Sequence, residues 1–351
     1  MIISGIQQMG IGIPDVYEAW KWYGTHFGMD IPVFDEAAEA GLMLPYTGGQ
    51  PRSRHAILAL NMQGGGGMEI WQYTSRVPVA PKFDIQLGDL GIFITKIKSK
   101  NAQVSYDILQ KQNVQFLSDL RNNPLGIPHF YLQDKYGNIF EVIESNDWFR
   151  TKDGIHTGGV YGAVIGVSDM EKSIAFYSEI LGYDEKIYDE SRGFEDFSRL
   201  KGGSNRVRRV ILKHKSPRKG AFSKMLGSSE IELVQSLDYS GQKIFKDRLW
   251  GDLGFIHLCF DINGMDEMRA FCTSKGHPFT VDSSNSFDMG EAAGHFSYIE
   301  DPDGTLIEFV ETHKVPILKK INWYLDLRKR PPEKALPNWM LKAMALNRKK
   351  W

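Results

Sequence analysis

Apolar and polar positions change period at regular intervals along the chain. A short apolar run at 10–13 precedes apolar residues spaced three or four apart, and a second run at 164–167 precedes the same spacing. The spaced residues are Val16, Ala19, Trp20 and Tyr23 in the first region and Met170, Ser173, Ile174 and Tyr177 in the second. Short apolar runs are typical of strands, and a spacing of three or four is typical of helices. Each region therefore predicts a strand followed by a helix.

Fixed distances identify the two regions as an internal repeat. Asp15 and Asp169 are each followed by a tyrosine after eight residues and by a glycine after thirteen. The two glycines, Gly28 and Gly182, stand where a helix commonly ends in a left-handed residue. Self-similarity of this kind indicates that one structural unit occurs more than once.

A second pair of segments extends the repeat. Residues 90–94 and 258–262 are predicted strands, and helices are expected to follow at about 97–112 and 265–275. Each segment closes with a turn rich in Asp, Pro and Gly and then a final apolar strand. The turns are Asp134-Lys135-Tyr136-Gly137 and Asp301-Pro302-Asp303-Gly304, and the strands are 139–143 and 306–310.

The chain is therefore predicted to contain four β-α-β-β-β modules, which we number one to four in chain order. They span about 5–75, 86–145, 158–237 and 253–312, with a linker at 146–157. The expected organisation is a domain at 1–150, a domain at 155–313 and a basic helical tail at 314–351. This arrangement belongs to the α+β class.

Two motifs resemble the vicinal oxygen chelate superfamily. They are the spaced set Asp169, Phe176, Tyr177, Leu181 and Gly182, and the ending Asp301-Pro302-Asp303-Gly304 with Glu308. The superfamily includes glyoxalase I, methylmalonyl-CoA epimerase, extradiol dioxygenases and the bleomycin and fosfomycin resistance proteins. The resemblance covers about residues 5–312, and it is specific for fold but weak for reaction because the fold hosts several chemistries. It implies modules paired into two cup-shaped mixed or antiparallel sheets with helices outside.

The resemblance also implies a divalent metal ion held by the first and last strands of two paired modules. The eight corresponding positions, in module order, are Gln8 and Glu69, Asp89 and Glu141, Gly162 and Glu232, and His257 and Glu308. Glu141 and Glu308 stand in strands that are apolar on both faces. A carboxylate buried there costs several kcal/mol unless it is paired or binds a metal. A solvent-facing glutamate on a half-exposed sheet is the alternative.

The ligand set depends on which modules pair. Neighbouring pairs would give Gln8, Glu69, Asp89 and Glu141 in one cup and Gly162, Glu232, His257 and Glu308 in the other. Pairing of module one with module four would instead join Gln8, Glu69, His257 and Glu308, which resembles the ligand set of glyoxalase I. The remaining cup would have lost a ligand at Gly162, which has no side chain. We therefore predict the outer pairing.

This ligand set implies a glyoxalase-like isomerase, epimerase or lyase with one divalent ion, either Zn, Ni, Fe or Mn. The ion would bind vicinal oxygens of a small carbonyl or hydroxy substrate and stabilise an enediolate, with Glu308 or Glu69 as the base. An Fe(II)-dependent extradiol ring-cleaving dioxygenase is the alternative, although Gly162 replaces a histidine that this reaction uses. A metal-free binding or resistance protein is a third reading.

Three residues with aromatic rings are candidates for contact with the substrate. Tyr298 lies ten residues before Glu308, and Tyr131 and His129 lie ten and twelve residues before Glu141. Alternation along a strand would turn these side chains toward a cup, although ordinary aromatic packing would explain them as well.

Composition narrows the setting. The 351 residues are 42% hydrophobic and 24% charged, which is typical of a globular protein. The two cysteines, Cys259 and Cys272, cannot form a disulfide framework, so a reducing cytoplasmic setting is expected. Neither a signal peptide nor an integral membrane segment is predicted. We expect a monomer or homodimer acting on a small molecule.

Charge separates the tail from the rest of the chain. Residues 314–351 carry a net charge of +9, which leaves −10 on the remainder. An acidic body argues against a nucleic-acid groove. Ile317, Leu318, Ile321 and Leu325 fit a short amphipathic helix, and 339–346 fit another. We expect the tail to pack on the acidic body or to act as a lid, with a peripheral membrane contact as the alternative.

Overall fold

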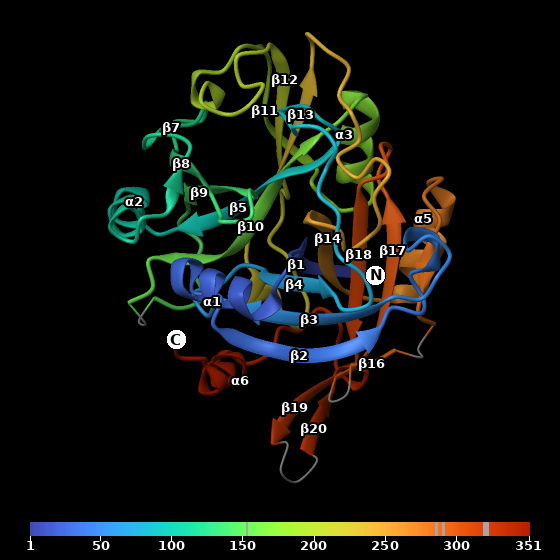
Figure 1. Ribbon diagram of the computed structural model, residues 1–351. Helices are drawn as coiled ribbons and strands as arrows, with labels where there is room; N and C mark the ends of the chain where they lie inside the picture. The colour runs from blue at the N-terminus through green and yellow to red at the C-terminus, as the bar shows by residue number, and fades with distance from the viewer. Residues whose placement is uncertain (152–153, 285–286, 290–291, 319–322) are drawn as a thin grey trace.

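The four predicted modules are present in the computed structural model, which describes residues 1–151, 154–284, 287–289, 292–318 and 323–351. Each module is a strand and a helix followed by further strands (Figure 1). Module one contains β1 (Ile2–Gly12), α1 (Val16–Phe27), β2 (Ile31–Glu39), β3 (Ser53–Leu60) and β4 (Gly67–Tyr73). Module two contains β5 (Gly91–Ser99), α2 (Ala102–Lys111), β6 (Gln115–Phe116), β7 (Arg121–Asn122), β8 (Pro128–Gln133) and β9 (Ile139–Glu144).

The second half of the chain repeats this order. Module three contains β10 (Thr157–Gly166), α3 (Met170–Glu179), β11 (Glu185–Arg192), β12 (Val207–Lys213), the short α4 (Ser223–Leu226) and β13 (Glu230–Ser236). Module four contains β14 (Gly254–Asn263), α5 (Met265–Ser274), β15 (Val281–Asp282), β16 (Phe287–Met289), β17 (Ala292–Glu300) and β18 (Leu306–Thr312).

Two large sheets form, and each takes one module from each half of the chain. Sheet A has the order β15-β17-β18-β14-β1-β4-β3-β2, so it joins modules four and one. Sheet B has the order β11-β12-β13-β10-β5-β9-β8-β6 and joins modules three and two. At the module boundaries, β1 pairs antiparallel with β14, and β5 pairs antiparallel with β10. The predicted outer pairing is confirmed.

The repeated Asp and Tyr residues have the same roles in both copies. The carboxylates of Asp15 and Asp169 accept backbone hydrogen bonds at the starts of α1 and α3. The repeated tyrosine of α1, Tyr23, donates a buried hydrogen bond of 2.6 Å to Asp134 in the closing turn of module two. Its counterpart Tyr177 donates one of 3.0 Å to Asp301 in module four. These tyrosines therefore connect consecutive modules that lie in different sheets.

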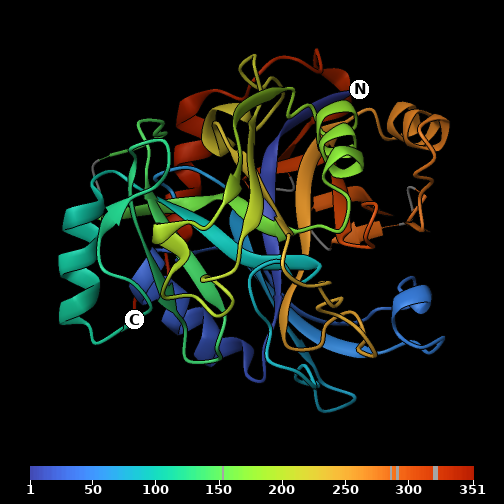
Figure 2. The same cartoon turned by 90° about the horizontal axis from the view of Figure 1, so that it is seen from above.

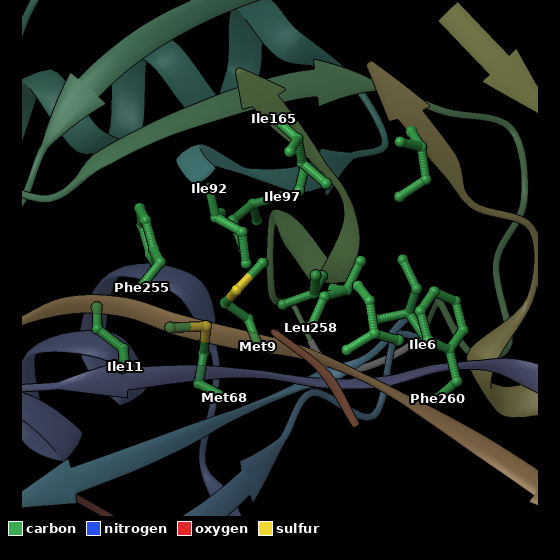
Figure 3. Packing of buried hydrophobic residues seen from close by; sticks show 14 of the residues in the cluster. Ile6, Met9, Ile11, Met68, Ile92, Ile97, Ile165, Phe255, Leu258 and Phe260 are labelled. Atoms are coloured by element: carbon green, nitrogen blue, oxygen red, sulfur yellow. The ribbon is translucent and has the colours of Figure 1, made fainter. Parts of the chain in front are cut away.

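The main hydrophobic core lies between the two sheets. Figure 3 shows side chains of β5 and β10 facing side chains of β1, β4 and β14 across this layer. The labelled residues are Ile92, Ile97 and Ile165 on one side and Ile6, Met9, Ile11, Met68, Phe255, Leu258 and Phe260 on the other. Alternate residues of the same strands point to the opposite face of each sheet. The residues between the core positions therefore line the cups.

The tail differs in part from its prediction. Residues predicted as the first tail helix instead form a hairpin, in which β19 (Lys314–Leu318) pairs antiparallel with β20 (Trp323–Asp326). The position 321 of that prediction lies outside the described residues. A short apolar run fits the period of a strand as well as that of a helix. Pairing within the hairpin gives hydrogen bonds to backbone N–H and C=O groups that a single helical turn would leave unpaired.

The remainder of the tail packs on sheet A. The second predicted helix is present as α6 (Asn338–Ala343) with a 3-10 turn at 344–347. Leu336 and Leu341 are buried in the same hydrophobic cluster as Leu58 and Leu60 of β3. Viewed from above, the red tail runs along one side of the molecule (Figure 2). The described tail therefore covers part of the body, as the charge difference suggested.

Candidate metal centre

Four side chains from the central strands of sheet A converge. Gln8 is on β1, Glu69 on β4, His257 on β14 and Glu308 on β18. His257 Nε2 lies 3.1 Å from Oε2 of Glu69 and 3.1 Å from Oε2 of Glu308. Gln8 Nε2 donates to the same two oxygens, at 3.2 and 3.4 Å. We call these four residues the Gln8 cluster.

Strand register explains this convergence. In the parallel pair β1–β4, Gln8 lies opposite Gly67, two residues before Glu69. In the parallel pair β14–β18, His257 lies opposite Leu306, again two residues before Glu308. The two halves of the cluster are therefore built alike, and the antiparallel β1–β14 contact brings them together.

A glycine in β1 makes room for the imidazole. Gly10 pairs with His257, and a Cβ atom at this position would lie 2.3 Å from Cε1 of the His257 ring. A real side chain would displace the ring. The ring therefore reaches the two carboxylates because β1 has no side chain here.

The cluster has a marked electrostatic imbalance. Burial alone would lower the pKa of His257, but the negative charges of Glu308 and Glu69 raise that pKa to about 10. Burial raises the pKa of Glu69, yet contact with His257 and the charge of Arg54 hold that pKa below its ordinary value. The imidazolium of His257 is thus the cation in direct contact with both buried carboxylates, and Arg54 adds a more distant positive charge.

The donor set fits a divalent ion. Ligand atoms of Glu69, His257 and Glu308 all lie within 4.8 Å of one another, and all three residues are buried. The Oε1 atom of Gln8 is buried without a hydrogen-bond partner. Carboxylate, imidazole and amide oxygen are donors that zinc, nickel, iron and manganese accept. These residues therefore suit the metal that the resemblance implied.

Aromatic rings surround His257. Tyr298, one of the three candidate substrate contacts, places its hydroxyl 3.5 Å from His257 Nδ1 and is 1% exposed. The ring of Trp250 stacks on that of His257, with centroids 6.4 Å apart and planes at 13°. Trp250 lies in the segment between modules three and four and was not a candidate. A tryptophan between two predicted modules was the sequence feature that could have identified it as a candidate.

The other two candidate contacts lie in sheet B. His129 Nδ1 is 2.6 Å from Oε1 of Glu141, and His129 Nε2 is 3.7 Å from Asp196. Tyr131 pairs with Glu141 in the ladder, as Tyr298 pairs with Glu308 in sheet A. Both residues belong to module two, whose cup is separate from the Gln8 cluster. Alternation along the strand correctly turned His129 and Tyr131 toward a cup, but that cup belongs to sheet B and not to the Gln8 cluster.

Asp89 does not occupy a ligand position. It precedes β5, and its carboxylate accepts from the backbone N–H groups of Gln86 and Gln242, at 2.8 and 2.9 Å. In the parallel pair β5–β9, the residue two positions before the partner of Glu141 is Ile94. The expectation for Asp89 was therefore wrong, because Asp89 is a turn residue and the strand starts later than the spacing suggested.

Sheet B has lost both first-strand ligands. Ile94 is apolar, and Gly162 has no side chain. A Cβ at Gly162 would lie 1.9 Å from the backbone oxygen of Glu230, so the close approach of β13 requires glycine. The predicted loss of a ligand at Gly162 is thus accompanied by a second loss in module two.

A lysine occupies the middle of this second cup. Lys96 Nζ lies 3.1 Å from Glu141, 2.7 Å from Glu230 and 2.5 Å from Glu232. Burial raises the pKa of Glu141, but Lys96, His129 and Arg209 together outweigh burial and lower that pKa to about 2. We call these four residues the Lys96 cluster. Lys96 was not among the predicted site residues, although a lysine within the apolar strand at 91–97 was a signal for it.

Comparisons with known proteins agree with this architecture. Residues 163–297 match the family model described as the Glyoxalase/Bleomycin resistance protein/Dioxygenase superfamily. No curated protein sequence matches the chain. None of the described helices is long and apolar enough to cross a lipid bilayer.

Solved structures resemble the chain over most of its length. Glyoxalase I from Zea mays is 12% identical, covers 98% of this chain and 96% of its own, and superposes with a TM-score of 0.52. A mutant of the same maize enzyme is 12% identical, covers 88% and 92%, and gives a TM-score of 0.53. A putative dioxygenase from Bacillus subtilis is 14% identical, covers 88% and 85%, and gives 0.55. At these identities the likeness establishes the fold, and the family-model match is limited to residues 163–297.

Proposed function

We propose that this chain, which has the vicinal oxygen chelate fold and matches that superfamily over residues 163–297, is a metal-dependent enzyme of the glyoxalase-like lyase or isomerase type. The observation that carries the proposal is the Gln8 cluster itself. Two carboxylates, one imidazole and one amide from four strands meet at one buried point. The substrate would be a small molecule with oxygens on neighbouring carbons.

A bound divalent ion would supply Lewis acidity to those oxygens. Gln8, Glu69, His257 and Glu308 would hold it. His257 must be neutral to offer Nε2 as a ligand, and Tyr298 beside Nδ1 limits the orientation of the ring. The buried aromatic rings of Trp250 and Tyr298 keep water away from this side of the imidazole.

Proton transfer would fall to Glu69 or Glu308. Both carboxylates lie at the same distance from His257 Nε2 and are only slightly exposed, at 9% and 7%. A carboxylate that takes a proton from carbon must approach that C–H group to about 3 Å. In the free protein, contact with His257 and the charge of Arg54 lower the pKa of Glu69, so its carboxylate is ionised. The same group would then return the proton to the neighbouring carbon.

The ring-cleaving dioxygenase reading has less support. That reaction uses two histidines and one glutamate, whereas the metal-ligand group found within the described residues has a single histidine. In sheet B, the corresponding first-strand positions hold Ile94 and Gly162. The donor set therefore favours proton transfer.

The test is hydrogen exchange in D₂O. Protein loaded separately with Zn²⁺, Ni²⁺, Mn²⁺ or Fe²⁺ would be incubated with hemithioacetals and α-hydroxycarbonyl compounds, and deuterium incorporation would be followed by NMR. We expect exchange or isomerisation with at least one metal, and a loss of about 100-fold or more in Glu308→Gln, the scale of a general base. Glu311→Gln on the same strand is the matched control and should retain activity. Oxygen consumption with catechols and Fe²⁺, without proton exchange, would reject the proposal.

A further inference from the structure

The position of Lys96 in the strand ladder is informative. Lys96 stands opposite Glu141 in the parallel pair β5–β9. The residues at the corresponding positions opposite Glu69, Glu308 and Glu232 are Gly10, Cys259 and Val164. Three modules thus have a small or short residue where module two has a lysine. The long side chain places its Nζ among the carboxylates of this cup.

The ammonium group of Lys96 is surrounded by carboxylates from both modules of sheet B. Glu141 comes from β9 of module two, whereas Glu230 and Glu232 come from β13 of module three. Each of these carboxylates is at most 1% exposed, and Lys96 is fully buried. Glu141 and Glu232 occupy the last-strand positions that Glu308 and Glu69 occupy in sheet A. The Lys96 cluster is therefore the counterpart of the Gln8 cluster.

A second cation supports the cluster from the side. Arg209 Nε contacts Glu232 at 2.6 Å, and its Nη1 contacts Asp196 at 2.6 Å. Burying several carboxylates is tolerated only when cations compensate their charge. Removal of one cation should leave buried carboxylates whose negative charge is not compensated, and a metal ion could then compensate it.

We propose that Lys96 replaces a metal ion in sheet B, so that this cup is a latent divalent-cation site closed by the protein's own ammonium group. Shortening Lys96 opens the site, and Glu141, Glu230 and Glu232 then bind a divalent ion. Three carboxylates suit Mn²⁺ or Co²⁺. This inference does not depend on the function of sheet A, because the Lys96 cluster shares no residue with the Gln8 cluster.

The experiment isolates sheet B by removing His257. In a His257→Ala background, Lys96→Ala should bind one Co²⁺ per chain, measured by equilibrium dialysis and by the visible absorption of Co²⁺. Co²⁺ should also raise the thermal midpoint of this double variant by several degrees. The matched control is Lys98→Ala in the same background. Lys98 is equally buried two residues along β5, but its Nζ donates to the backbone oxygen of Asp147 and has no carboxylate cluster. It should bind no Co²⁺.

Two outcomes would overturn the inference. The first is that the double variant folds but binds no Co²⁺. The inference also fails if the double variant does not fold even when Co²⁺ is present during refolding, whereas the Lys98→Ala control folds. The second needs no change at Lys96. The His257→Ala variant, in which Lys96 is intact, should bind no Co²⁺ at millimolar concentration. If it does bind Co²⁺, and if adding Glu141→Gln abolishes that binding, then Lys96 does not close the cup.

Discussion

Binding of a metal ion to the Gln8 cluster would change the charge state of His257. Its pKa of about 10 in the free protein means that the imidazole carries a proton at pH 7. A metal ligand must be the neutral imidazole, so binding has to displace that proton. The two carboxylates that raise the pKa are the same groups that would hold the ion.

We predict that metal binding releases about one proton per ion at pH 7 and that the apparent affinity rises roughly tenfold per pH unit between pH 6 and 8. The sign follows from the raised pKa, because alkali removes the competing proton. Calorimetric titration in buffers of different ionisation enthalpy measures the release. Binding without proton uptake by the buffer would contradict this account of His257.

Gly10 tests the space around the same ring. Gly10→Ala would place a Cβ 2.3 Å from Cε1 of His257, in a backbone conformation that alanine otherwise tolerates. We expect at least a tenfold loss of metal affinity and a fall of about 1–3 kcal/mol in the free energy of unfolding, as in other overpacked sites. Metal titration and urea unfolding measure the two effects.

Gly41→Ala is the matched control, because nothing lies within 4 Å of a Cβ at that position. It should leave both quantities unchanged. Equal behaviour of the two variants would mean that His257 does not need the space beside Gly10.

At the scale of elements, strand register explains why the sequence located Gln8 correctly and misplaced the ligand position of module two. Gln8 lies seven residues before Asp15, and this spacing locates it because a helix start fixes the end of the preceding strand. Asp89 was misplaced because module two has no Asp at its helix start, and Asn101 caps α2 instead. Counting seven residues back from Asn101 leads to Ile94, the position that the ladder confirms.

The C-terminal segment shows the limit of periodicity. A few apolar residues at 317–325 satisfied a helical spacing, but the described residues on either side of 319–322 pair as strands. The spacing of apolar residues also did not predict the contacts of the C-terminal Trp351. Trp351 packs edge-on against Trp20 of α1, with ring centroids 4.9 Å apart, and Gly24 leaves room for its indole.

This contact gives a prediction for the tail. Trp351→Ala should lower the free energy of unfolding by about 1–2 kcal/mol, because it removes an aromatic pair and exposes part of α1. Trp339→Ala is the control, since Trp339 is 65% exposed and its loss should change stability little. Chemical denaturation compares the two, and equal effects would mean that the C-terminal residue does not anchor the tail.

At the scale of the whole molecule, the two halves of the chain depend on each other. The centre of sheet A is the β1–β14 pair and the centre of sheet B is the β5–β10 pair, so each sheet is completed only by the other half. The sequence predicted this pairing, because modules one and four together give a ligand set that resembles that of glyoxalase I. Lys96 was missed because its role depends on carboxylates contributed by another module.

We predict that residues 1–150 and 155–351 do not fold cooperatively when they are expressed separately. Each half would expose two unpaired central strands, β1 and β5 or β10 and β14, and half of the core between the sheets. Mixing the halves should restore cooperative thermal unfolding and metal binding, as followed by circular dichroism and dialysis. A half that unfolds cooperatively as an isolated monomer would contradict this dependence.

The location of the metal tests the central claim most directly. A crystal of the full chain grown with Co²⁺ would be measured above and below the cobalt absorption edge. The account predicts one strong anomalous peak bonded to Glu69, His257 and Glu308, with Gln8 beside it, and no peak within the Lys96 cluster. A peak elsewhere, or none in a crystal whose protein binds Co²⁺ in solution, would contradict the claim that modules one and four together hold the ion.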